Sequence, residues 1–292
     1  MAAPQPSYDF HTTATAAAST LSASIANKTI LITGVTPNSL GAHFAATIAS
    51  HAPRLLILAS RTQSAIDATA AAIRAADSAV AVRGVIVDLA SLASARRAGD
   101  EVARMQRDEG VVVDVLVLNA GVMACPYEVT GDGFERQFGT NHLGHFVFAN
   151  AVIPGMLAGE GRKPRVVVVS SEGHQLGPVR WADPGFAGGE TYDKWRAYGQ
   201  AKTANLSVFA SNGNPQGFKE YWEKHPFKTL DEGTSTHVVA AFADWIEKDN
   251  GKFLRDAQIC SFDMVAPWAR NSYDAERLWR MSEDMVGEKF DF

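Results

Sequence analysis

The sequence lacks the features that mark disulfide-rich, metal-binding and nucleic-acid-binding proteins. It has two cysteines, Cys125 and Cys260, in 292 residues, which excludes a disulfide framework and a cysteine metal cage. Acidic residues outnumber basic ones by 32 to 27, and the net charge of −5 disfavours nucleic acid or an anionic membrane as the main partner. We therefore expect a reducing, cytoplasmic location and a small-molecule partner.

Long apolar runs and nucleotide-triphosphate loops are also missing. No stretch is apolar and long enough to predict a membrane span. Ala14–Asn27 is rich in Ala, Ser and Thr, but no basic segment precedes it, so it makes a poor secretory signal. We predict instead that residues 1–27 form a short helical extension leading into the first strand. The absence of a Gly-Lys-Ser/Thr loop disfavours an NTPase.

From residue 28 onward, short apolar runs alternate with segments of helical period. Runs such as Val166–Val169 suit strands buried on both faces, and their alternation with helices predicts a parallel sheet. We predict one doubly wound Rossmann-type α/β domain over residues 28–292, with helices on both faces of the sheet. The predicted strands are Thr29–Thr33, Leu55–Ser60, Val82–Asp88, Val113–Asn119 and Arg165–Ser170, and the predicted helices are Leu40–Ser50, Gln63–Ala76, Ser91–Arg107 and Gly133–Leu157.

The turn after the first predicted strand has glycines where a dinucleotide would bind. It reads Thr33-Gly34-Val35-Thr36-Pro37-Asn38-Ser39-Leu40-Gly41 and opens into a helix. Glycines let the backbone approach a pyrophosphate, which then lies at the helix N-terminus. The spacing is not the standard fingerprint, and Asn38 stands where a glycine is expected, although asparagine tolerates a positive φ. An ordinary strand–helix turn is the alternative interpretation.

The ends of the next strands supply further candidate cofactor contacts. Ser60 and Arg61 end the second strand where an NAD site has an acidic residue, and an arginine there accommodates a 2′-phosphate. This favours NADP(H); a solvated arginine is the alternative. Asp88 and Leu89 end the third strand at the depth of an adenine. Asn119-Ala120-Gly121 ends the fourth, where small residues let the backbone pass close to a ribose.

Tyr198 and Lys202 lie four residues apart, so on a helix both side chains point the same way. A lysine ammonium beside a phenol lowers the tyrosine pKa, as a proton-transfer catalyst needs. Such a pair also arises by chance on many helices. Ser170-Ser171, at the end of an apolar run upstream, and the glycine-containing turn together favour the catalytic interpretation.

The chain resembles the short-chain dehydrogenase/reductase family, and within it the fungal, retinol-dehydrogenase-like, NADP-dependent members. The likeness covers residues 28 to about 210 and resumes from residue 227. Five motifs occur in the family's order, and that ordered set is specific although no single member of it is. They are Thr33-Gly34…Gly41, Asn119-Ala120-Gly121, Asn141-His142-Leu143-Gly144-His145, Ser170-Ser171 and Tyr198…Lys202.

The resemblance implies a role for each of four residues. Tyr198 would be the general acid/base at the substrate oxygen, and Ser171 would hydrogen-bond and polarise that oxygen. Lys202 would hold the nicotinamide ribose and lower the pKa of Tyr198, while Asn141 would position a water linking Lys202 to solvent. The implied cofactor-binding residues are Gly34, Thr36, Asn38, Leu40, Gly41, Ser60, Arg61, Asp88, Leu89, Asn119, Ala120, Gly121, Tyr198 and Lys202.

These roles imply an enzyme that transfers a hydride between NADP(H) and a carbonyl/alcohol group of a small, lipophilic substrate. The resemblance also implies a dimer or tetramer built on the helices around Asn141 and Tyr198. No metal site is predicted, because His142 and His145 have no carboxylate or thiolate partner at ligand spacing. Both are expected either to pack internally or to belong to a substrate loop, and His174 is expected to line the pocket.

The chain departs from the family after Ala210. Family members there have a sixth strand and a Pro-Gly turn that contacts the nicotinamide carboxamide, whereas this chain has a turn cluster at Ser211–Gly217. The fifth strand would then be a bare sheet edge. One hypothesis is that Lys252–Ser261 pairs with this edge. Separately, Tyr221, Trp222 and Phe227 are expected to form either a replacement lid over the pocket or a loosely packed surface segment. The alternative to an active enzyme is a catalytically impaired NADP(H)-binding protein or an inactive, truncated family member.

Overall fold

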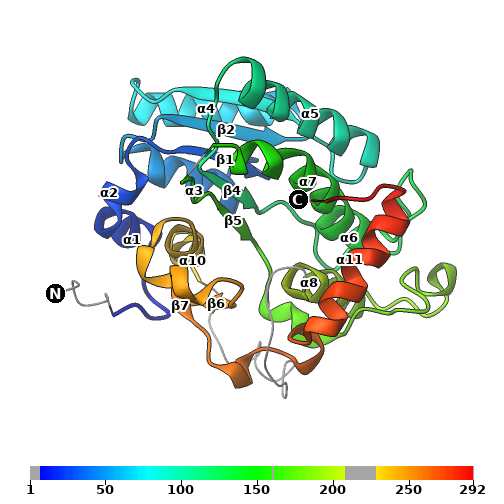
Figure 1. Ribbon diagram of the computed structural model, residues 1–292. Helices are drawn as coiled ribbons and strands as arrows, with labels where there is room; N and C mark the ends of the chain where they lie inside the picture. The colour runs from blue at the N-terminus through cyan, green and yellow to red at the C-terminus, as the bar shows by residue number, and fades with distance from the viewer. Residues whose placement is uncertain (1–6, 160, 208–227, 292) are drawn as a thin grey trace.

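The computed structural model describes residues 7–159, 161–207 and 228–291. Its centre is a five-stranded, all-parallel sheet with the strand order β3-β2-β1-β4-β5 (Figure 1). The predicted parallel sheet is confirmed, although the last residues of three predicted strands lie in the loops that follow. The strands are β1 (Thr29–Thr33), β2 (Leu55–Ser60), β3 (Val82–Ile86), β4 (Val115–Leu118) and β5 (Arg165–Val168).

Helices cover both faces of the sheet, as predicted for a doubly wound fold. Side chains alternate along β1, so Ile30 and Ile32 pack into the core on one face and Leu31 into the core on the other. The first face is covered by α1 (Ala14–Thr20), α2 (Ser22–Ile25), α3 (Leu40–Ala49), α4 (Gln63–Ala76) and α10 (Leu230–Phe242). The second is covered by α5 (Leu92–Asp108), α7 (Gly144–Leu157), α8 (Lys194–Ser207) and α11 (Ser272–Val286).

The predicted helix Gly133–Leu157 is wrong in its first part. Helix α6 (Arg136–Phe138) begins later, because the Glu135 side chain caps it by accepting hydrogen bonds from the Gln137 and Phe138 amides. A single π-helical turn, Gly139–Leu143, then joins α6 to α7. Its apolar pattern does not differ from that of an α-helix, so the sequence did not reveal it. The widened turn contains Asn141, one of the four residues assigned to catalysis.

The N-terminal extension packs into the core. It forms two short helices, which meet at Leu21, rather than the single helix predicted. Ala14, Ala17 and Ala18 recur at helical spacing along the buried face of α1, which packs against α10 and α3. Thr15 donates to the Asp231 carboxylate on α10 from both its amide and its hydroxyl.

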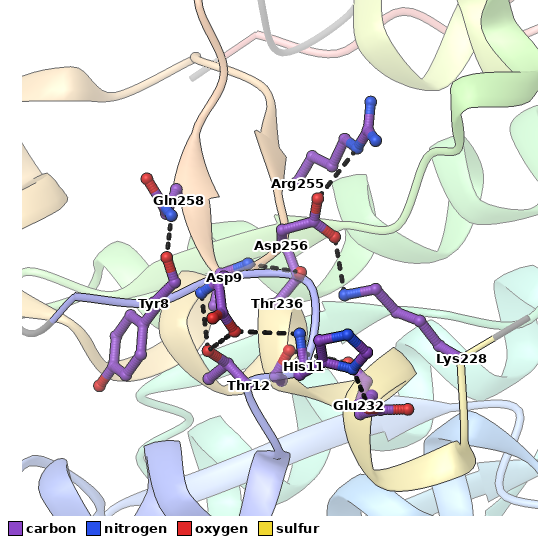
Figure 2. A network of polar contacts seen from close by, with 12 residues as sticks. Tyr8, Asp9, His11, Thr12, Lys228, Glu232, Thr236, Arg255, Asp256 and Gln258 are labelled. Atoms are coloured by element: carbon purple, nitrogen blue, oxygen red, sulfur yellow. Dashed lines mark hydrogen bonds and ion pairs between the residues drawn. The ribbon is translucent and has the colours of Figure 1, made fainter. Parts of the chain in front are cut away.

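β5 ends the sheet, and no strand among the described residues pairs with its outer edge. Pairing of Lys252–Ser261 with that edge was a wrong prediction. β6 (Leu254–Arg255) and β7 (Gln258–Ile259) pair only with each other, because Asp256 and Ala257, at φ 54° and 60°, close a tight hairpin. Hydrogen bonds join the hairpin to α10 and to the N-terminal segment. The Ala257 amide donates to Thr236 of α10, and the Gln258 side chain donates to the Tyr8 carbonyl (Figure 2).

The turn cluster at Ser211–Gly217 and the three lid residues lie outside the described residues. Among the described helices, none is both long enough and apolar enough to cross a membrane.

Candidate active site

Helix α8 buries Tyr198 and Lys202 on one face, beside the end of β5. Tyr198 is 9% exposed and Lys202 4%. The Lys202 ammonium lies 5.7 Å from the centre of the Tyr198 ring and donates to the Val169 carbonyl at 2.9 Å. The helix therefore places both residues where sequence spacing predicted and ties the lysine to the segment that follows β5.

Burial governs the ionisation of both groups. It lowers the pKa of Lys202 to about 8, because the ammonium is removed from water. It also raises the pKa of Tyr198, and a hydrogen bond from Ser171 offsets this only in part. The expected lowering of the Tyr198 pKa by Lys202 is therefore not what the structure gives. Sequence spacing could not show this, because desolvation depends on the whole surrounding fold.

Ser171 opens a short 3₁₀ turn, Glu172–Leu176, that packs against the tyrosine. Its Oγ accepts a hydrogen bond from the Gly173 amide at 3.0 Å. A side chain at Gly173 would collide with the Tyr198 ring, because a Cβ there would lie 2.8 Å from Cδ1 and closer still to Cε1. The structure thus brings Ser171 and Tyr198 into contact, while the roles that the resemblance implies for them stay predictions.

His174 packs behind this turn, away from the cavity, and stabilises it by hydrogen bonds. It does not line the pocket, contrary to expectation. It is completely buried; its Nδ1 lies 2.7 Å from the Ser171 carbonyl, and its Nε2 lies 3.1 Å from the Ala266 amide. Since the amide must donate, Nε2 is unprotonated and Nδ1 carries the proton. Burial lowers the pKa of His174 to about 4, so this arrangement is neutral at pH 7.

Asn141 and Lys202 both lie close to Gly121. Its Oδ1 accepts from the Val122 amide at 2.8 Å, and its Nδ2 donates to the Val122 carbonyl at 2.9 Å. A Cβ on Gly121 would be 3.1 Å from Asn141 Oδ1 and 3.7 Å from Lys202 Nζ. The side-chain amide of Asn141 therefore holds the loop after β4, and its implied role in positioning a water stays a prediction.

The glycine turn after β1 lies at the same edge of the sheet. Gly34 has φ 78°, and a Cβ there would lie 2.7 Å from Ala120 Cα. Asn38 has φ 65°, the left-handed conformation for which asparagine was considered suitable. Ser39 caps α3 by accepting from the Ala42 amide, and it donates to the Gly34 carbonyl. The turn is closely packed on β4 and leaves the N-terminus of α3 facing this edge.

Asn119 ties this turn to two other parts of the fold. Its Nδ2 donates to the Thr33 carbonyl at 2.8 Å, and its Oδ1 lies 3.2 Å from Nε2 of His237 on α10. The Thr33 hydroxyl lies 2.9 Å from Nε2 of His145. Sequence reasoning missed Thr33 and His237 as partners of the site, because their contacts join residues far apart in the chain.

The remaining candidates lie at the end of β2, just after β2 or β3, or on the turn before α3. Ser60 is buried, whereas Arg61 is exposed and has no hydrogen bond or ion pair with any described residue. Asp88 is half-buried and accepts a hydrogen bond from the Ala90 amide. Leu89 packs its carbonyl against Gly144, at the start of α7. Thr36 is exposed, and Leu40 lines the cavity described next.

A cavity of about 1200 Å³ runs along the outer edge of β5 and reaches Ser171. Figure 1 shows α10 on one side of β5 and α8 on the other. The sheet wall is formed by residues such as Val166 and Val168, and the opposite wall by His237 and the hairpin residues Leu254 and Arg255.

Two histidines near the site, His142 and His145, are buried and make hydrogen bonds within the protein. His142 Nε2 lies 2.7 Å from the Ser282 hydroxyl, and burial lowers the pKa of His142 to about 3 and that of His145 to about 4. Within residues 7–159, 161–207 and 228–291, no group of three or more His, Cys, Asp or Glu side chains could hold a metal ion.

The chain matches a known protein family. The family model described as short chain dehydrogenase matches residues 28–182, more than half of the chain. The chain therefore belongs to the short-chain dehydrogenase family.

Several curated mammalian proteins are similar to this chain. Retinol dehydrogenase 12 of Bos taurus is 34% identical over 203 residues, 61% of this chain and 62% of that protein. Retinol dehydrogenase 14 of Mus musculus is 32% identical over 231 residues, 69% and 66% of the two chains. Polyprenol dehydrogenase of Mus musculus is 36% identical over 203 residues, 58% of each. The chain thus spans about three-fifths to two-thirds of the length of these relatives.

Solved structures show the same fold. An uncharacterised protein from Mycobacterium paratuberculosis superposes with a TM-score of 0.70 at 30% identity, covering 92% of this chain and 96% of that one. A short chain dehydrogenase from Pseudomonas syringae has a TM-score of 0.57 at 18% identity, covering 78% and 93%. The second likeness concerns the fold alone.

Proposed function

We propose that this protein is an NADP(H)-dependent oxidoreductase acting on a carbonyl/alcohol pair of a small, lipophilic substrate. The observation that carries the proposal is the contact between Ser171 and Tyr198, with Lys202 one helical turn away. All three lie at the sheet edge that also contains the Gly34–Gly41 turn. When bound, the nicotinamide supplies or accepts the hydride, and the protein supplies orientation and proton transfer.

The chain's own groups suit the proton transfer. Burial raises the pKa of Tyr198, so the phenol keeps its proton at neutral pH and can donate it to a substrate oxygen during reduction. Ser171 lies beside it to hydrogen-bond the same oxygen. Lys202, whose pKa is lowered to about 8, is still cationic at pH 7 and lies 5.7 Å from the centre of the Tyr198 ring.

The turn after β1 fits a dinucleotide. Gly34 and Gly41 both lie where a Cβ would be within 3 Å of neighbouring atoms, so only glycine lets the backbone lie this close to β4. The N-terminus of α3 favours a pyrophosphate. Arg61, exposed and without a described partner at the end of β2, suits a 2′-phosphate and supports NADP(H) over NAD(H).

The cavity supports a lipophilic substrate. Its lining includes the apolar residues Val166, Val168, Leu206 and Phe253, together with charged residues such as Glu172 and Arg255. The similar retinol and polyprenol dehydrogenases are named for apolar alcohols. We extend that substrate class to this chain as part of the proposal.

The edge of β5, with which no strand of the described residues pairs, favours a second candidate function, a catalytically impaired NADP(H)-binding protein. The cavity beside Ser171 is bounded on that side by no described strand. A substrate held there would have fewer fixed walls, so hydride transfer would suffer more than cofactor binding.

The test first measures the binding of NADPH and of NADH to the purified chain. Nucleotide fluorescence gives the affinities, and a thermal-shift assay checks that the protein is folded. Turnover of all-trans-retinal and of simple ketones is then followed by NADPH absorbance. We expect tighter binding of NADPH and measurable turnover, which Tyr198→Phe reduces at least about 100-fold without loss of NADPH binding. Tyr273→Phe is the matched control, because Tyr273 is 71% exposed on α11.

Two outcomes would decide against the first proposal. Cofactor binding without turnover of any carbonyl or alcohol tested would support the impaired binding protein. Turnover unaffected by Tyr198→Phe would show that the tyrosine takes no part in the chemistry.

We also propose that the protein is cytoplasmic, which cell fractionation would check. We propose in addition that it is a homo-oligomer, which light scattering would check.

A further inference from the structure

An ion pair joins the Ser171 turn to the β6–β7 hairpin. Glu172, which directly follows Ser171, has its Oε1 2.5 Å from Nη1 of Arg255. Both side chains are 23% exposed, and both residues line the cavity along β5. Arg255 also pairs with Asp256 at 3.1 Å, and Asp256 pairs with Lys228 at 2.7 Å, as Figure 2 shows. Four alternating charges therefore run from the Ser171 turn to the start of α10.

The hairpin end of this chain of charges is firmly anchored. The Ala257 amide donates to Thr236 of α10 at 3.0 Å, and Gln258 donates to the Tyr8 carbonyl (Figure 2). Helix α10 itself packs on α1, α3 and β5. Arg255 therefore lies on a segment that is fixed to α10, and it can hold the Glu172 side chain in place.

The Ser171 turn, in contrast, follows the edge strand. Neighbouring strands brace the loops between them, but β5 has a described partner on one side only. Behind the turn, His174 binds the Ser171 carbonyl and the Ala266 amide. On the cavity side, Glu172 reaches Arg255. A shift of the Glu172 backbone would move both Ser171 Oγ and the Gly173 segment that contacts the Tyr198 ring.

We propose that the Glu172–Arg255 ion pair positions Ser171 for the reaction, so that the hairpin supports the turn that follows β5. Both are positioning residues, since they act through Ser171. This inference rests on the proposed function. The ion pair holds the Ser171 turn, so its loss should affect kcat and leave cofactor binding unchanged.

The experiment uses the full chain and the variants Arg255→Gln, Glu172→Gln and the double variant. We expect each single variant to lower kcat about 10- to 100-fold, because small misplacements of a catalytic group have effects of that size. The double variant should be no worse than the poorer single variant, because both substitutions remove the same contact. Arg280→Gln, which removes the Arg280–Glu276 pair on α11, is the matched control and should behave as wild type.

A second readout does not depend on turnover. The amides of Gly173 and His174 donate to the oxygens of Ser171, so hydrogen exchange in this turn reports its order. Exchange of the peptide covering residues 171–176 should be faster in Arg255→Gln and unchanged in Arg280→Gln. Arg255→Lys keeps the positive charge, so exchange in the turn and kcat should lie between those of wild type and Arg255→Gln. This variant replaces Arg255→Gln in the experiment if Arg255→Gln does not fold.

Three results would overturn the inference: additive losses of kcat in the double variant, unchanged exchange in the turn, or a loss of NADPH affinity equal to the loss of kcat. If the wild-type chain shows no turnover, the proposed function fails. The exchange measurement then still decides whether Arg255 orders the turn.

Discussion

Replacing Gly173 by alanine tests the packing of the catalytic turn on Tyr198. The added Cβ would lie 2.8 Å from Cδ1 of that ring, closer to Cε1, and 3.3 Å from Ser171 Oγ. Gly173 is not among the glycines with positive φ, so the backbone itself accepts alanine. The predicted effect therefore comes from steric overlap with a ring that is 9% exposed and has little room to move.

The magnitude follows from two opposing terms. Overpacking a buried site costs about 1–3 kcal/mol. Alanine also restricts the unfolded chain, which offsets about 0.4–1 kcal/mol of that cost. We expect Gly173→Ala to lower the free energy of unfolding by about 1–2 kcal/mol. Because the ring must shift to relieve the overlap, turnover should fall about 100-fold.

Urea unfolding and NADPH-coupled turnover measure the two effects. Gly131→Ala is the control, because a Cβ at Gly131 meets nothing within 4 Å and its φ is not positive; it should change stability by less than about 0.5 kcal/mol. In a Tyr198→Ala background the cost of Gly173→Ala should largely disappear. If Gly173→Ala is as stable and as active as Gly131→Ala, the contact inferred between the turn and the tyrosine is not rigid.

Three further predictions concern the glycine turn, the cofactor and acid stability. Asn38→Ala should destabilise the protein by about 1–2 kcal/mol, since φ is 65°, whereas Asn38→Gly should not; equal urea midpoints would refute this. Arg61→Ala should weaken NADPH binding about 10- to 100-fold in fluorescence titrations and leave NADH binding unchanged, and an equal loss for both would assign Arg61 no role with the phosphate. Burial lowers the pKa of His142 to about 3 and those of His145, His174 and His237 to about 4, while all four are near 6.5 when unfolded. The unfolded state then binds more protons below pH 6.5, so the free energy of unfolding should fall between pH 6.5 and 4.5, by up to about 1.4 kcal/mol per pH unit for each histidine. His174→Gln should reduce that slope, and a flat profile would contradict the burial of these rings.

The sequence by itself determined the sheet and the approximate position of the site. Strands buried on both faces leave continuous apolar runs, so β1 and β2 were predicted with the bounds they have. The carboxyl ends of parallel strands meet at one edge, which places Gly34, Asn119 and Ser171 together without further information. The period of an α-helix puts Tyr198 and Lys202 on one face. These are consequences of local geometry, which sequence spacing records.

The tertiary structure alone decided how the site is supported and how its groups ionise. Hairpin pairing of β6 with β7, and not with β5, depends on left-handed φ values at Asp256 and Ala257, which the sequence did not signal. His174, His237 and Arg255 join the site through contacts between residues distant in the chain. The pKa directions of Tyr198 and Lys202 are set by burial, and burial is a property of the whole fold that no spacing of residues encodes.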